Sequence, residues 1–146
     1  MRSISEEILA SVSRDCDIIM RESGLSEMEE YSLESLEIAH KAVEIANDKQ
    51  ASNIVLLDTS KVCSFADYFV ICSSDSSRQI KTIFEEIEHS LKKEGILPHH
   101  REGETDSGWM LLDFGDVIIH IFATYERELY QLDELWSEAD ALLRIQ

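Results

Sequence analysis

The chain has little proline, glycine, cysteine or positive charge, and each shortage limits what the protein can be. Its 146 residues include one proline, five glycines and three cysteines, and 44% of them are hydrophobic. This is the composition of a folded soluble protein rather than of a low-complexity chain. The length suits a single domain that can bury a core.

The three cysteines, Cys16, Cys63 and Cys72, include no closely spaced pair. An odd, scattered set argues against a disulfide framework and against a structural zinc site. We expect buried thiols that act as small hydrophobic side chains.

Long hydrophobic runs are also missing. No apolar stretch approaches the roughly 20 residues that a membrane span needs. The first fifteen residues mix acidic with apolar side chains, unlike a signal or transit peptide. The sequence therefore predicts a cytoplasmic protein without membrane contact.

Basic residues are outnumbered, because 30 acidic residues face 13 basic ones and the formal net charge is −17. Such a surface repels phosphate, so little direct contact with nucleic acid is expected. It suits a partner with a basic protein surface, whose approach it would accelerate. The alternative is that the charge only maintains solubility.

Residues 1–31 are predicted to form an amphipathic helix followed by a connector. Ser3 and Glu6 make a capping box, apolar residues recur at helical spacing from Ile8 to Met20, and 26–30 are polar. This pattern divides the chain into an N-terminal extension, 1–31, and a domain, 32–146. We expect the extension to be dispensable for folding of the rest.

The remaining pattern predicts an α/β (α+β) fold with a single mixed β-sheet flanked by helices. The first helix is expected from about Leu33 to Asp48, capped by Ser32. A second, over 78–94, is capped by a Ser76–Gln79 capping box and links parallel strands. Strands are expected at 53–58, 67–72, 109–113 and 117–122, with a short one within 99–107 and a last helix over 129–143.

Few residues suggest chemistry. Asp113, Asp116 and His120 could hold a metal, but the two aspartates flank a turn, where they would bond their own backbone. The segment 73–78 joins a strand to a helix as phosphate loops do, yet it lacks glycine. No nucleophile has an evident base, so we predict no catalytic, cofactor or metal site.

Trp109 follows a polar, acidic loop and opens a strand. A tryptophan at the rim of a sheet is either a lid on the core or an interface anchor. As an anchor, its replacement by alanine should weaken binding and leave the fold intact. As a lid, the same change should cost stability.

From about Leu36 to Trp136 the chain resembles the Iojap, or ribosomal silencing factor, family. The matching stretches cover roughly two-thirds of the chain and are, in order, Ala66–Cys72, Ser76–Ile80, Glu102–Gly103, Gly108–Trp109, Leu111–Asp113, Gly115–Phe122, Arg127, Tyr130, Leu132, Leu135 and Trp136. The family usually has glycine and threonine before its Ser-Ser-Arg, where this chain has Ser73, Ser74 and Asp75. That loop is therefore expected to differ in shape.

The resemblance implies a five-stranded mixed sheet, shaped like a nucleotidyltransferase but without its catalytic residues. It implies a non-enzymatic repressor of translation that binds the fourteenth L-series protein of the large ribosomal subunit and blocks the small subunit. Organellar relatives act in ribosome biogenesis, and free family members are commonly homodimers. The partner-binding residues expected from the matching stretches are Trp109, Glu102, Asp67, Tyr68 and Tyr130.

Two other functions stay open. One is a nucleotide-handling enzyme on the same fold, which Ser73, Ser74 and Asp75 support only weakly. The other is an acidic interaction module for a different basic partner.

Overall fold

Six strands form one mixed sheet in the order β3-β4-β5-β2-β1-β6. We describe it from a computed structural model, in which the backbone of residues 25–146 and the side chains from residue 34 onward are defined. The elements are α2 (Leu25–Asp48), β1 (Ser52–Asp58), β2 (Tyr68–Ser74), α3 (Ser77–Lys93), β3 (His100–Glu102), η1 (Thr105–Ser107), β4 (Trp109–Asp113), β5 (Val117–Ala123), α4 (Thr124–Tyr130), α5 (Leu132–Leu135) and β6 (Asp140–Ile145).

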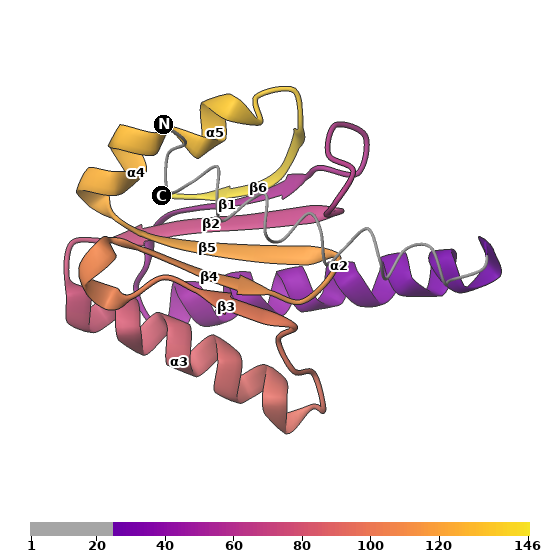
Figure 1. The fold of residues 1–146 in the computed structure, drawn as a ribbon, viewed down its shortest axis with the longest axis horizontal. Coiled ribbons are helices and arrows are strands. Elements are labelled where there is room, and N and C mark those ends of the chain that lie inside the picture. Colours follow the sequence, from indigo (N-terminus) through magenta and orange to yellow (C-terminus); the bar gives the residue numbers. More distant parts are fainter. Residues whose placement is uncertain (1–24) are drawn as a thin grey trace.

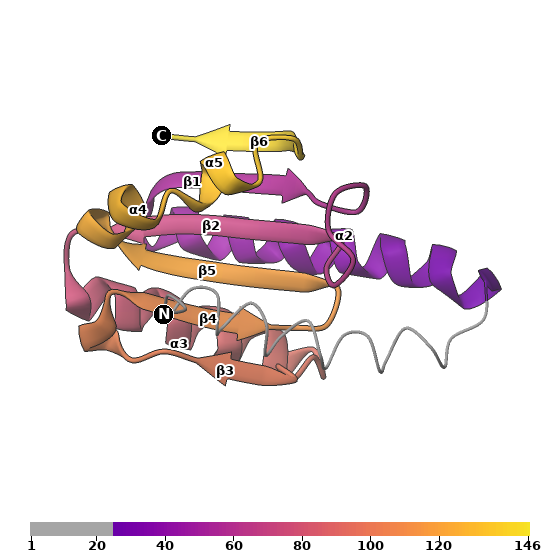
Figure 2. The ribbon, with the colours of Figure 1, turned by 45° about the horizontal axis from the view of Figure 1, so that its top comes forward.

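Helices cover both faces of the sheet, as Figures 1 and 2 show: α2 and α3 lie on one face, α4 and α5 on the other. Strands β2 and β5 are parallel neighbours, and every other pair in the sheet is antiparallel. The predicted α/β class, with one mixed sheet flanked by helices, is confirmed. No helix within residues 25–146 has the length and hydrophobicity to cross a membrane.

Strand alternation separates two apolar clusters, one on each face. In β5, Val117, Ile119 and Ile121 pack beneath α2 and α3, whereas Ile118 and Phe122 face the other side. The apolar stripe of α2 packs on the first face through small side chains such as Ala39, Ala42 and Ala46, all fully buried. These side chains let the helix lie close to the strands.

The predicted helix over 129–143 is wrong in its second half. Residues 140–145 form β6, which pairs antiparallel with β1 and makes the sheet six-stranded rather than five-stranded. The first half is two short helices rather than one, because α4 begins at Thr124, the left-handed residue Gln131 ends it, and α5 ends at Leu135. Beyond α5, the backbone of a short apolar segment pairs with the free edge of β1, and such short runs suit either structure.

Two helix starts also differ from expectation. Helix α2 begins at Leu25 rather than near Leu33, so Ser32 is not a cap and the polar residues 26–30 are helical. No glycine or proline separates these residues from the rest of the helix, and glutamate favours helices. The division of the chain at residue 31 stays a prediction, and the helix expected before it lies outside the described residues.

At the start of α3 the capping box is only half formed. The Ser76 hydroxyl accepts a hydrogen bond from the Gln79 backbone N–H, as predicted. The Gln79 amide instead donates to the carbonyl oxygens of Lys49 and Gln50 at 2.7 and 3.0 Å. It thereby ties α3 to the connection between α2 and β1.

Candidate functional site

Trp109 lies in the core beside the helical hairpin α4–α5. Its side chain is 2% exposed, stacks on Phe122 with ring centroids 4.8 Å apart, and contacts Tyr130 at 5.1 Å. Strand β4 positions it there because Trp109 pairs with Phe122 of β5, so both point to the same face. A buried ring cannot serve directly as a surface anchor.

His120 completes this aromatic group. The Trp109 Nε1–H donates to His120 Nδ1 at 3.2 Å, so the neutral imidazole carries its proton on Nε2. Burial, together with the positive charge of Arg127, lowers the pKa of His120 from 6.5 to about 3. The ring is therefore neutral at physiological pH and cannot act there as an acid–base catalyst.

The five residues expected to bind a partner divide into two groups. The first group is Glu102, Trp109 and Tyr130. Glu102 pairs with Leu111, which lies two residues from Trp109 on the same face of β4. Tyr130 packs on Trp109. Asp67 and Tyr68 lie at the other end of β5, because Tyr68 pairs with Val117 and Trp109 with Phe122. Five residues of strand separate the groups, roughly 17 Å.

Tyr68 is moreover 8% exposed and belongs to the cluster on the opposite face, beneath α2. The structure thus brings together Glu102, Trp109 and Tyr130, and excludes Tyr68 from that surface. Asp67 is half-buried, and its pKa is raised by burial and by the nearby carboxylates of Asp116 and Asp58. The sequence-based set combined residues from two faces because side-chain direction depends on register.

Helices α4 and α5 expose apolar side chains that the sequence-based prediction missed. Tyr125, Leu129 and Leu135 are 70%, 58% and 65% exposed, and they are three of the five large hydrophobic side chains exposed among the described residues. Tyr125 and Leu129 are four residues apart and share one side of α4. We call these three residues the α4–α5 surface. In the sequence, Leu129 and Leu135 share helical spacing with Leu132, which predicts one apolar stripe. The structure buries only Leu132 and leaves the other two exposed.

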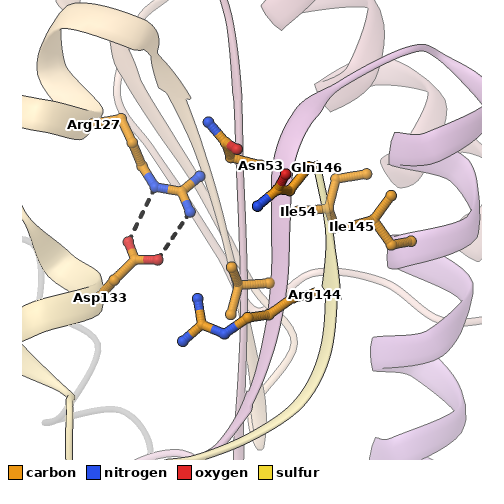
Figure 3. A pocket seen from close by; sticks show the side chains of 8 residues that line it. Asn53, Ile54, Arg127, Asp133, Arg144, Ile145 and Gln146 are labelled. Atoms are coloured by element: carbon orange, nitrogen blue, oxygen red, sulfur yellow. Dashed lines mark hydrogen bonds and ion pairs between the residues drawn. The ribbon is translucent and has the colours of Figure 1, made fainter.

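A bidentate ion pair fixes the hairpin beneath this surface. Arg127 of α4 donates from Nε and Nη2 to the Asp133 carboxylate at 3.0 and 2.9 Å (Figure 3). The Arg127 side chain is 11% exposed, so the pair is largely shielded from water. It holds α4 and α5 together across the left-handed residue Gln131, whose φ is 46°.

The other residues considered for a metal or phosphate site make structural hydrogen bonds. Asp113 accepts a hydrogen bond from the Gly115 N–H at 2.7 Å, which confirms its role in the turn. Ser74 donates to the Gln79 side chain at 2.6 Å, and Ser73 to the Ser52 carbonyl at 3.1 Å. Among the side chains described, no three His, Cys, Asp or Glu gather as metal ligands.

The two described cysteines are buried, as predicted, whereas Cys16 lies outside the described residues. Burial raises the pKa of Cys63, and it raises that of Cys72 to about 12. A thiol with so high a pKa holds its proton at neutral pH, so neither group is poised as a nucleophile.

Comparison with known proteins places this arrangement in a family. Residues 32–146 match the family described as "Ribosomal silencing factor during starvation". The chain belongs to the ribosomal silencing factor family. It is similar to the ribosomal silencing factor of Bacillus subtilis, with 38% identity over 67% of this chain and 83% of that protein.

Two further relatives extend the comparison within the ribosomal silencing factor family. A crystal structure of a protein from Chromobacterium violaceum has 32% identity, a TM-score of 0.68, and coverage of 70% of this chain and 86% of that one. The mouse protein named "Mitochondrial assembly of ribosomal large subunit protein 1" is 29% identical over 65% of this chain and 43% of its own length. The family resemblance inferred from the sequence motifs is thereby confirmed.

Proposed function

We propose that this protein is a cytoplasmic ribosomal silencing factor. It binds the large ribosomal subunit through the fourteenth L-series protein and sterically prevents the small subunit from joining, which represses translation. Membership of the silencing factor family supports this proposal, and so does a relative named for assembly of the large subunit. The factor acts by occupying a surface and performs no catalytic step.

The α4–α5 surface is the observation that carries the proposal. Its three apolar side chains are exposed, and the same hairpin and the residues after it present the exposed carboxylates of Glu128, Glu134 and Glu138. Exposed apolar side chains with polar groups nearby are typical of protein interfaces. With a net charge of −17, the matching partner is a basic protein surface with an apolar centre.

Glu102 and Tyr130 extend the proposed contact on the same face of the sheet, and Trp109 supports Tyr130 from the core. The ring contact of 5.1 Å between Trp109 and Tyr130 makes the tryptophan a positioning residue rather than an anchor. Asp67 and Tyr68 are outside this contact. We further propose that the free protein is a homodimer, which light scattering across a dilution series would test.

Sedimentation with purified ribosomal subunits tests the proposal. We expect the full chain to migrate with the large subunit and not with the small one. Tyr125→Ala and Leu129→Ala should each weaken binding by about 2 kcal/mol, the range of interface hot spots. Leu97→Ala is the matched control, because Leu97 is 58% exposed but lies between α3 and β3.

Equal loss of binding in Leu97→Ala and Leu129→Ala would contradict the proposed surface. Migration of the full chain with neither subunit would contradict the function itself. Titration calorimetry with ATP and magnesium adds an independent check, because micromolar binding would favour a nucleotide-handling enzyme.

A further inference from the structure

A pocket of about 190 Å³ opens where β1 begins, β6 ends and the α4–α5 hairpin approaches them (Figure 3). Its polar lining includes Arg127, Arg144 and Asn53. The other lining residues are Asp133, Gln146, Ile54, Val55 and Ile145. Two arginines therefore converge on one small pocket in a chain with only 13 basic residues and a net charge of −17. The docking proposal uses none of these polar groups.

Arg127 is held rigidly and retains a free donor. Its Nε and Nη2 are occupied by Asp133, whereas Nη1 is buried and has no hydrogen-bond partner among the described residues. A buried donor without an acceptor destabilises the fold, and the cost is greater when the donor is charged. Such a group indicates that an acceptor is missing from the structure as it stands.

Asn53 supplies an independent sign of a binding site. Its φ is 50°, in the left-handed region, and the register between β1 and β2 is irregular between Ser52 and Val55. Such an irregularity in the ladder redirects side chains, and it is frequent beside functional sites. Here it leaves Asn53 in the pocket lining beside Arg127, as Figure 3 shows.

We propose that this pocket binds a small oxyanion, a phosphate or carboxylate group, between Arg127, Arg144 and Asn53. Both groups match the planar donors of arginine, and the Asn53 amide can donate to either. Asp133 pairs with Arg127 and leaves its Nη1 unoccupied, and no carboxylate partner of Arg144 is found among the described side chains. A polynucleotide is a poor candidate because the rest of the surface repels its backbone.

A bound anion would join residues of three elements. Arg127 belongs to α4, Arg144 to β6 and Asn53 to β1, so one bound anion would tie the hairpin to the edge of the sheet. The anion therefore stabilises the native state by an amount that grows with the logarithm of its concentration once this exceeds the Kd. This inference is independent of the ribosomal proposal, since it concerns a ligand of the free protein.

Thermal melts and titration calorimetry of the full chain test the site, with inorganic phosphate and acetate as probes. Chloride at equal ionic strength provides the reference. We expect phosphate, acetate or both to raise the melting temperature beyond chloride, and the stronger probe identifies the anion class. In ¹H–¹⁵N spectra, the largest shifts should fall on the backbone amides of Asn53, Arg127 and Arg144.

Arg144→Gln should weaken binding of the stronger probe about tenfold, the effect of losing one charge-assisted hydrogen bond. Asn53→Gly keeps the left-handed backbone and removes the amide, so it should also weaken binding without loss of stability. Arg78→Gln is the matched control, because it removes one exposed positive charge from α3. It should leave binding unchanged.

Three outcomes would overturn the proposal. The first is that neither phosphate nor acetate exceeds chloride. The second is that Arg78→Gln weakens binding as much as Arg144→Gln, which would indicate general electrostatic attraction. The third is that single-stranded RNA binds the pocket more tightly than either small anion.

Discussion

The indole of Trp109 makes aromatic contacts with Phe122 and Tyr130 and donates a hydrogen bond to His120. Because the ring is buried, Trp109→Ala should lower the free energy of unfolding by about 3–5 kcal/mol. Trp109→Phe keeps an aromatic ring and should cost less. Urea denaturation measures both changes. If Trp109→Ala lost little stability but no longer bound the ribosome, Trp109 would be an interface anchor rather than a core residue.

His120 makes stability depend on pH. In the unfolded chain its pKa is near 6.5, whereas in the fold it is about 3, so the unfolded state binds the additional proton between these values. Stability is therefore lost as pH falls from 6.5 towards 3, by about 1.4 kcal/mol per pH unit for this one group.

His120→Gln should remove this part of the acid sensitivity, because glutamine can accept the Trp109 hydrogen bond but does not titrate. Thermal melts of both proteins at pH 7 and pH 4.5 provide the comparison. An unchanged difference between the two pH values in the variant would show that His120 titrates normally in the fold.

At the scale of elements, β6 covers the edge of β1. Its residues are mostly exposed, yet its backbone pairs with β1 from Ile54 to Asp58. Removing residues 140–146 would expose that edge, whose strand is apolar and buried through Val55, Leu56 and Leu57. Such an edge is a template for pairing with another chain.

The shortened chain is therefore expected to melt at a lower temperature and to associate at high concentration. Calorimetry and light scattering measure these effects. Leu142→Ser is the control, because it changes an exposed side chain of β6 and leaves the backbone pairing intact. A shortened chain that stays monomeric with an unchanged melting temperature would show that β6 does not protect the edge.

For the whole molecule, the first question is whether residues before α2 contribute to the fold. The family match begins at residue 32 and α2 at Leu25. We expect a chain that begins at Leu25 to melt within about 3 °C of the full protein. A much larger loss would show that the first 24 residues pack on the domain through their apolar stripe.

The net charge of −17 predicts how the whole molecule meets its partner. An acidic protein that approaches a basic protein beside RNA is attracted at one place and repelled elsewhere. The association rate with the large subunit should fall about tenfold or more as ionic strength rises from about 0.05 to about 0.5 M, because salt screens the attraction. Stopped-flow measurement across a salt series tests this. A constant rate would exclude electrostatic steering.

The sequence by itself determined the elements whose pattern is local. The apolar patterns predicted β1 and β2, and the cap at Ser76 marked the start of α3. These features depend on residues within a few positions of one another, so they can be predicted without knowledge of the tertiary structure. The sequence motifs also indicated the family.

Only the tertiary structure decided what depends on distant segments. Residues 140–145 form a strand because β1 presents a free edge, and Trp109 is buried because Phe122, His120 and Tyr130 close around it. The pocket with Arg127 and Arg144 exists because α4 and β6 approach the start of β1. Strand pairing, burial of Trp109 and the meeting of the two arginines all depend on segments far apart in the chain. The local spacing of apolar residues therefore cannot predict them.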